Sequence, residues 1–120
     1  MRLSELQSEH GEWLKHNFPD QEKHDALLGV MEEIGELAHA HLKYQQGIRG
    51  YTMTEYYADA SDAIGDIVIY LASYCNANHL NLGFCLDQTW ARVKKRDWIK
   101  DPVKGGESEP SDATGSVVVP

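Results

Sequence analysis

The sequence predicts an all-α protein in which four helices form a bundle. Apolar residues recur at helical spacing through residues 1–98, and the alternation of period two that marks strands is hard to find. With 120 residues, 42% of them hydrophobic, the chain suits one compact domain. We expect this helical domain over residues 1–99. The remaining residues, 100–120, are rich in Gly, Ser and Pro and have the composition of a disordered tail.

The first two helices are predicted from their start and stop signals. The first runs from about Ser4, which would form a capping box with Gln7, to Asn17, shortly before Pro19. The second begins near Asp20 and ends around the two glycines of "YQQGIRGY". Its apolar residues are expected to form one buried face: Leu27, Val30, Met31, Ile34, Leu37 and Ala38.

The third and fourth helices follow the same apolar spacing. The third is expected from about Thr54 to Asn78, and the segment "NANHLNLG" marks a turn after it. Its inward residues are Ala60, Ala63, Ile64, Ile67, Val68, Leu71 and Cys75. The fourth runs from Leu82 to Trp98 and ends in the basic cluster "RVKKRDW", where positive charge also favours the end of a helix dipole.

The charge and the apolar content limit the partners that the protein can have. A net charge of -8 at pH 7 disfavours broad contact with nucleic acid or anionic lipid. No segment approaches the roughly 20 apolar residues that cross a bilayer, and the N-terminus lacks an apolar signal region. We therefore expect a cytoplasmic protein without membrane contact. An anionic ligand would need a positive mediator, such as a divalent cation held by carboxylates.

Two stripes of acidic residues lie on the second and third predicted helices. Glu33 and Glu36 are separated by about 60° around the helix axis, and Glu32 lies about 40° from Glu36. The third helix carries acids at i, i+3 and i+7 and a tyrosine one turn later: Asp59, Asp62, Asp66 and Tyr70. Because hard cations such as Mg²⁺ bind oxygen ligands, two acidic stripes on neighbouring helices predict a metal site.

The glycines beside these acids support the same interpretation. "EIGEL" at 33–37 and "AIGDI" at 63–67 share the pattern Ile, Gly, acid, aliphatic. A glycine inside a helix costs about 1 kcal/mol relative to alanine. We therefore expect Gly35 and Gly65, together with Gly29, to let a helix or a ligand approach the backbone closely.

Alternatives to a magnesium site remain open at this point. Glutamates on an amphipathic helix often form a solvated face. His39 and His41 lie about 200° apart and cannot share one ligand face, so we expect them at the surface or at a partner interface. Glu36 and His39 do form the ExxH pair of carboxylate-bridged di-iron bundles, although no other helix supplies a second pair.

The stretch "EEIGE", followed about thirty residues later by "DAIGDIVIYL", resembles the MazG-like all-α nucleoside triphosphate pyrophosphohydrolases over roughly residues 20–98. That family carries EExxE on one helix and ExxD on the next. The first motif is matched by Glu32, Glu33 and Glu36, and the last acid of the second by Asp66. One position departs from the pattern, since Ala63 stands where ExxD has its glutamate. Asp62, one turn before Asp66, could replace that ligand, with Asp59 in reserve.

The resemblance implies a helical bundle of the MazG-like type that forms a homodimer or homotetramer. Its activity would be the Mg²⁺-dependent cleavage of (d)NTP between the α and β phosphates to (d)NMP and pyrophosphate, with Mn²⁺ as a substitute metal. On this hypothesis the metal ligands are Glu33, Glu36, Asp62 and Asp66, and the catalytic carboxylates are Glu32 and Glu33. Trp13 and Tyr70 would contact the base, and Lys94 and Arg96 the phosphates. The rivals are a non-catalytic nucleotide-binding module, a di-metal carboxylate protein and a helical interaction protein.

Overall fold

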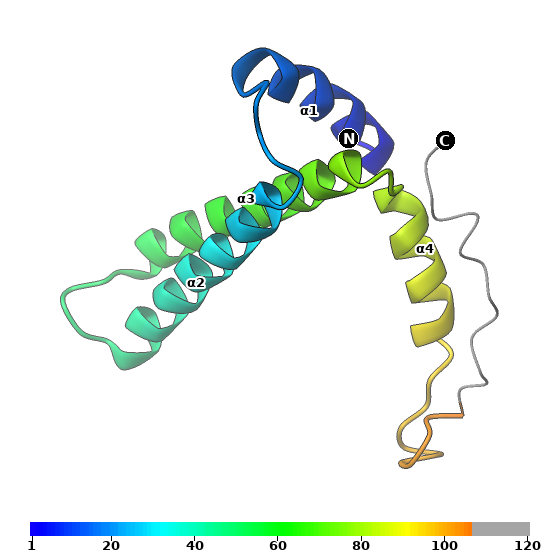
Figure 1. The fold of residues 1–120 in the computed structure, drawn as a ribbon. Coiled ribbons are helices and arrows are strands. Elements are labelled where there is room, and N and C mark those ends of the chain that lie inside the picture. The colour runs from blue at the N-terminus through cyan, green and yellow to red at the C-terminus, as the bar shows by residue number, and fades with distance from the viewer. Residues whose placement is uncertain (107–120) are drawn as a thin grey trace.

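The computed structural model of the protein describes residues 1–106, which fold into four α-helices and contain no strand (Figure 1). The helices are α1 (Leu3–Asn17), α2 (Asp25–Gln46), α3 (Met53–Ala77) and α4 (Leu82–Val93). The all-α prediction and the number of helices are therefore confirmed. None of the described helices combines the length and the apolar character needed to cross a membrane.

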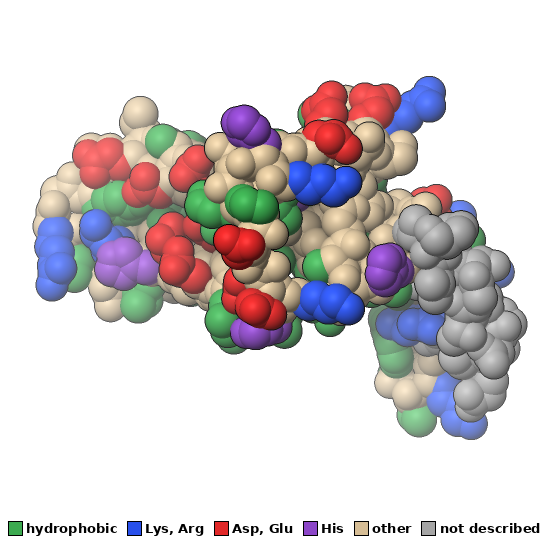
Figure 2. All heavy atoms as spheres, turned by 45° about the horizontal axis from the view of Figure 1, so that its top comes forward, with side chains coloured by type: hydrophobic (Ala, Val, Ile, Leu, Met, Phe, Trp, Pro, Cys, Tyr) green, Lys and Arg blue, Asp and Glu red, His purple; other side chains and the backbone are tan. Residues whose placement is uncertain are grey.

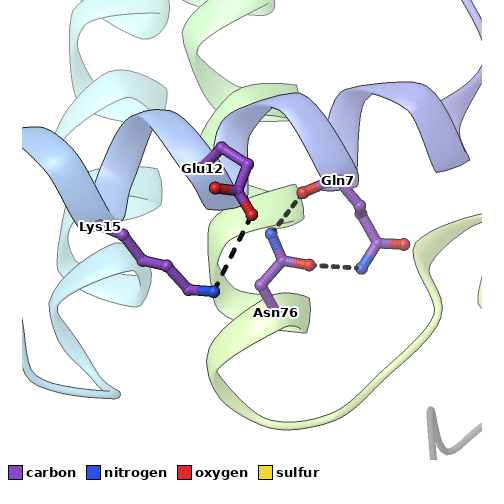
Figure 3. Close-up of polar contacts among 4 residues, drawn as sticks. All are labelled: Gln7, Glu12, Lys15 and Asn76. Atoms are coloured by element: carbon purple, nitrogen blue, oxygen red, sulfur yellow. Dashed lines mark hydrogen bonds and ion pairs between the residues drawn. The ribbon is translucent and has the colours of Figure 1, made fainter.

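The start of α1 differs from the prediction. Its N-cap position is occupied by Arg2, with no side-chain hydrogen bond, so the capping box of Ser4 and Gln7 was wrong. The Gln7 side chain instead reaches the far end of α3. Its Nε2 atom donates to the Asn76 Oδ1 (3.0 Å), and Asn76 Nδ2 donates to the backbone carbonyl of Gln7 (2.8 Å; Figure 3). The same Nε2 atom also donates to the backbone carbonyl of Leu80 (3.0 Å).

The second helix begins later than expected, at Asp25 instead of Asp20. The Asp25 carboxylate accepts a hydrogen bond from the Glu22 backbone N–H (2.8 Å), which holds residues 22–25 in a turn before the helix. At its other end Gly47 adopts a left-handed conformation (φ 63°), as a helix-ending glycine does. The α3 and α4 starts are capped by the side chains of Thr52 and Asn81.

The fourth helix ends at Val93, five residues before the predicted end at Trp98. Two aspartates hold the chain that follows in tight turns. Asp97 accepts from the backbone N–H groups of residues 99 and 100, and Asp101 from those of residues 103, 104 and 106. Residues 100–106 of the predicted tail are thus part of these turns, and residues 107–120 lie outside the described residues.

The helices do not close into a bundle within one chain. α2 and α3 pack side by side as a hairpin, α1 lies against α3, and α4 runs away from the hairpin (Figure 1). Among the described helices, α4 makes contacts with α1 and α3 but none with α2. The radius of gyration is 18.0 Å, whereas a compact domain of this length has about 13.5 Å.

The open arrangement leaves much of the predicted core exposed. The buried apolar side chains are mostly small and lie where α2, α3 and α1 touch: Ala26, Val30, Ala40, Ala60, Ala63, Ala72 and Cys75. Six residues that were predicted to point inward are exposed, the five larger ones by 37–64%: Leu27, Met31, Ile34, Ala38, Ile64 and Leu71. Their burial was wrongly predicted for a single chain, because a two-helix hairpin covers only one strip of each helix.

Candidate functional site

Three glutamates of α2 converge on one side of the helix. Their spacing places oxygen atoms of Glu32, Glu33 and Glu36 all within 4.8 Å of one another. Glu32 and Glu36 are exposed, whereas only 7% of Glu33 is accessible to solvent. The motif that the sequence singled out therefore forms a compact group of carboxylates with one buried member.

Glu33 is held in an unfavourable electrostatic environment. Its Oε2 atom is buried and has no hydrogen-bond partner among the described residues. Burial raises the pKa of Glu33, and the nearby carboxylates of Glu36, Asp66 and Glu32 raise it further. A buried carboxylate without compensation is costly, so this environment favours either a proton or a cation at Glu33.

The aspartates of α3 approach this group from the facing helix. Asp62 and Asp59 line a cavity of about 380 Å³ together with Glu32 and Glu36, and Gly35 and His39 complete its wall. Asp59 already accepts a short hydrogen bond from the Tyr51 hydroxyl (2.5 Å), which raises the pKa of Tyr51 to about 12. Asp62 is therefore the better placed of the two to serve as an additional ligand beside the glutamates.

A second, larger cavity of about 610 Å³ extends from Asp66 toward α1. Its wall includes Tyr70 and Ser73 of α3 and, from α1, His10 and Trp13. His10 stacks on Trp13 with a centroid distance of 5.5 Å, so the α1 side of the cavity presents flat aromatic surface. Such surface suits a planar ring.

The structure thus places Trp13 and Tyr70, both predicted to contact a base, around the same cavity as Asp66. The sequence analysis missed His10 and Phe18, which also line it. His10 precedes Trp13 by three residues, and this i, i+3 spacing on one helix face was the signal that could have revealed it.

The three glycines behave differently from one another. A Cβ atom at Gly29 would lie 2.5 Å from the Tyr70 ring, so the predicted close approach is confirmed there. A Cβ atom at Gly35 or Gly65 would meet no atom of another described element within 4 Å, so no described helix of the same chain packs closely on either glycine. Gly29 therefore lets Tyr70 cross from α3 to the α2 backbone, which fixes one wall of the larger cavity.

The predicted phosphate ligands are not brought to the carboxylates within one chain. Lys94 and Arg96 lie in the turns after α4, and α4 does not contact α2. The residues that line the two cavities beside the acids include no lysine or arginine. The site of a single chain is therefore strongly acidic.

Together the fold and the site define an all-α protein that carries a carboxylate cluster, next to an aromatic cavity, on a helical hairpin. Comparisons with protein-family models, with curated proteins and with solved structures found no match. The chemistry of the site is therefore argued from its own residues.

Proposed function

We propose that the protein is a Mg²⁺-dependent nucleoside triphosphate pyrophosphohydrolase of the MazG-like type. The observation that carries the proposal is the Glu33 Oε2 atom, buried and without a hydrogen-bond partner among the described residues, inside a cluster of carboxylates. The motif resemblance supports it independently, because the clustered residues Glu32, Glu33 and Glu36 are those that match EExxE.

The carboxylate set fits a hard divalent cation. Glu33, Glu36 and Asp66 would supply oxygen ligands, and Asp62 would provide the fourth acid in place of the family glutamate, whose position is the buried Ala63. Bound Mg²⁺, or Mn²⁺ in its place, would neutralise phosphate charge and polarise the phosphoryl group. A bound cation would offset both the burial of the Glu33 carboxylate and its repulsion by the neighbouring carboxylates.

The two cavities divide the substrate between them. The triphosphate lies at the carboxylates, and the base stacks in the aromatic cavity beside Trp13 and Tyr70, where Asp66 lines the wall and acts electrostatically on Glu33. Water attacks the α phosphorus in line, the bond to the bridging oxygen of the β phosphate breaks, and (d)NMP and pyrophosphate result. Glu32, which is exposed, would take the proton from the attacking water.

A homodimer or homotetramer is part of the proposal. The open arrangement of the helices and the exposed apolar side chains of α2 and α3 support it. Association of two or more chains would bury these side chains and so stabilise the folded protein.

Pyrophosphate release from a panel of NTPs and dNTPs with Mg²⁺ tests the activity. Glu36→Gln and Asp66→Asn should each reduce the rate by about 100-fold or more, since each removes a charged metal ligand. Glu12→Gln is the matched control, because Glu12 is an exposed acid on α1 away from the site. The proposal fails if wild type releases no pyrophosphate from any substrate, or if both site variants keep full activity.

A carboxylate-bridged di-metal protein is the second candidate, favoured by the position of His39 beside Glu36 around the smaller cavity. Purified protein would then contain iron and show an oxo-bridge absorption band. A protein that binds Mg²⁺ and nucleotide without turnover would instead be a nucleotide-binding module. If Mg²⁺ leaves the melting temperature unchanged, the helical interaction protein is favoured.

A further inference from the structure

The charge of the chain is divided between two parts of the structure. Residues 1–81, which we call the body, hold five Lys and Arg against thirteen Asp and Glu. Residues 82–106, which we call the arm, consist of α4 and the turns after it and hold six Lys and Arg against three Asp. In Figure 2, red side chains spread over much of the body, and several blue ones lie together at the lower right, where the arm ends. The body thus has a net charge of −8, and the arm has one of +3.

Both parts also expose large apolar side chains. On the arm, Leu86 and Trp90 of α4 are more than half exposed, and Ile99 in the turns is 97% exposed. On the hairpin, Leu28 and Met31 of α2 are more than 60% exposed. A monomeric protein rarely leaves this much apolar surface uncovered on two separate elements.

The arm cannot cover the hairpin of its own chain in this fold. Its first residues are fixed against α1, where the Leu82 N–H donates to the Gln7 Oε1 (2.9 Å), and Gly83 lies close to Leu3. From this anchor α4 leads away from the hairpin, and it makes no contact with α2 (Figure 1). The exposed Lys94 and Lys95 follow at its far end.

We propose that two copies of the chain pair so that the arm of each lies on the α2–α3 hairpin of the other. In this arrangement Lys94 and Lys95 reach the carboxylate site of the second copy and bind the phosphates of its substrate. The docking follows from the charges and the exposed apolar surfaces alone. The role given to the lysines rests in addition on the proposed function.

A second copy fits the arm better than an unrelated partner does. It presents the acidic and apolar surface that the arm complements, and a two-fold axis pairs both arms with both hairpins at once. It also supplies what each site lacks, because the described residues around the two cavities include no lysine or arginine. A triphosphate needs positive groups besides the metal to offset the charge that builds up on its leaving pyrophosphate.

Mixing two inactive variants tests the exchange of arms. One variant is Glu36→Gln, and the other combines Lys94→Glu with Lys95→Glu; each alone should fall at least about tenfold below wild type. When both are mixed at high salt and dialysed, a mixed dimer holds one site with intact acids and an intact arm. The mixture should therefore recover about a quarter of the wild-type rate. A mixture no more active than its components shows that each arm serves its own chain and overturns the proposal.

Cross-linking tests the docking without any need for activity. Equal amounts of ¹⁴N- and ¹⁵N-labelled protein are mixed and treated with a carbodiimide, which joins lysines to nearby carboxylates. The proposal expects peptides from the arm, containing Lys94 or Lys95, linked to acidic peptides of α2 or α3, with about half of these pairs of mixed isotope. Lys15→Glu, the same charge reversal on an exposed α1 lysine, should leave the cross-link in place.

Links found only within single isotopes, or a protein that stays monomeric at high concentration, would overturn the docking. If wild type shows no pyrophosphate release but mixed-isotope links form, the proposed function fails and the docking stands. If activity is present and the links are confined to single chains, the function stands and the docking fails.

Discussion

Glu33 exposes 7% of its surface, and its buried Oε2 atom has no hydrogen-bond partner among the described residues. Its neighbours Glu36 and Asp66 add like charge. The ionised Glu33 therefore lowers the stability of the metal-free folded state. The pKa of Glu33 is raised above 4.5, hence the folded state binds its proton more tightly than the unfolded state does. The penalty is therefore fully present above the raised pKa and is relieved as the pH falls toward 4.5.

Removing the Glu33 charge should separate its destabilising effect on the metal-free protein from its proposed role in binding Mg²⁺. In EDTA at neutral pH, Glu33→Gln should melt at a higher temperature than wild type, because a buried charge among like charges is removed. The difference should shrink as the pH is lowered, and Mg²⁺ should stabilise wild type but not the variant. Thermal melts in EDTA and in Mg²⁺ measure both effects. A variant that is less stable than wild type in EDTA would show that Glu33 is not strained in the metal-free protein.

At the scale of elements, α1 is positioned by a small polar network. Gln7 and Asn76 exchange two hydrogen bonds (Figure 3). Gln7 also bonds the backbone carbonyl of Leu80 and the backbone N–H of Leu82, where the chain enters α4. This network fixes α1 against the end of α3, and so places His10 and Trp13 over the larger cavity. The start of α4 shares the same anchor, so the direction of the arm depends on it.

Disrupting the network of Gln7 and Asn76 should lower the free energy of unfolding far more than removing the exposed ion pair that Figure 3 also shows. Asn76→Ala leaves partly buried partners unsatisfied and should lower the free energy of unfolding by about 1–3 kcal/mol. Lys15→Ala removes the ion pair between Lys15 and Glu12 (3.9 Å), whose side chains are 81% and 80% exposed. This substitution should change the free energy of unfolding by less than about 0.5 kcal/mol. Chemical denaturation of both variants provides the comparison. Equal losses would contradict the anchoring role of Asn76.

At the scale of the whole molecule, the main feature is that a single chain buries little of its apolar surface. The described residues contain no large side chain that is fully buried, and the hairpin and the arm diverge. The sequence has the apolar content of a compact domain, but the fold exposes much of it. Association is the physical means by which such a chain gains the burial that a single copy lacks.

Stability should therefore depend on protein concentration. Between about 1 and 100 μM, the hundredfold increase should stabilise a folded dimer by about 2.7 kcal/mol relative to unfolded chains, so the melting temperature should rise. High salt should weaken the effect, since opposite charges on the arm and the body contribute to it. Melting curves at several concentrations and light scattering measure this. A melting temperature that does not vary with concentration would indicate a stable monomer.

Much of the fold could be predicted from the sequence because helix signals are local. The apolar spacing identified four helices, and the α1 end, the α2 end and both limits of α3 lie within one residue of the prediction or inside the predicted loop. The errors arose where a side chain that could serve a local cap or turn instead bonds a residue far away in the sequence. Gln7 was assigned to a cap but bonds Asn76, which lies 69 residues away.

The candidate site divides in the same way. The sequence by itself determined which acids share a face, because a helix fixes the angles between Glu32, Glu33 and Glu36 wherever it packs. Only the tertiary structure decided that Glu33 is the buried member, that Asp62 lies beside the exposed glutamates, and that α4 carries its lysines away from them. Those outcomes depend on how whole helices pack, and packing is set by contacts between residues far apart in the chain.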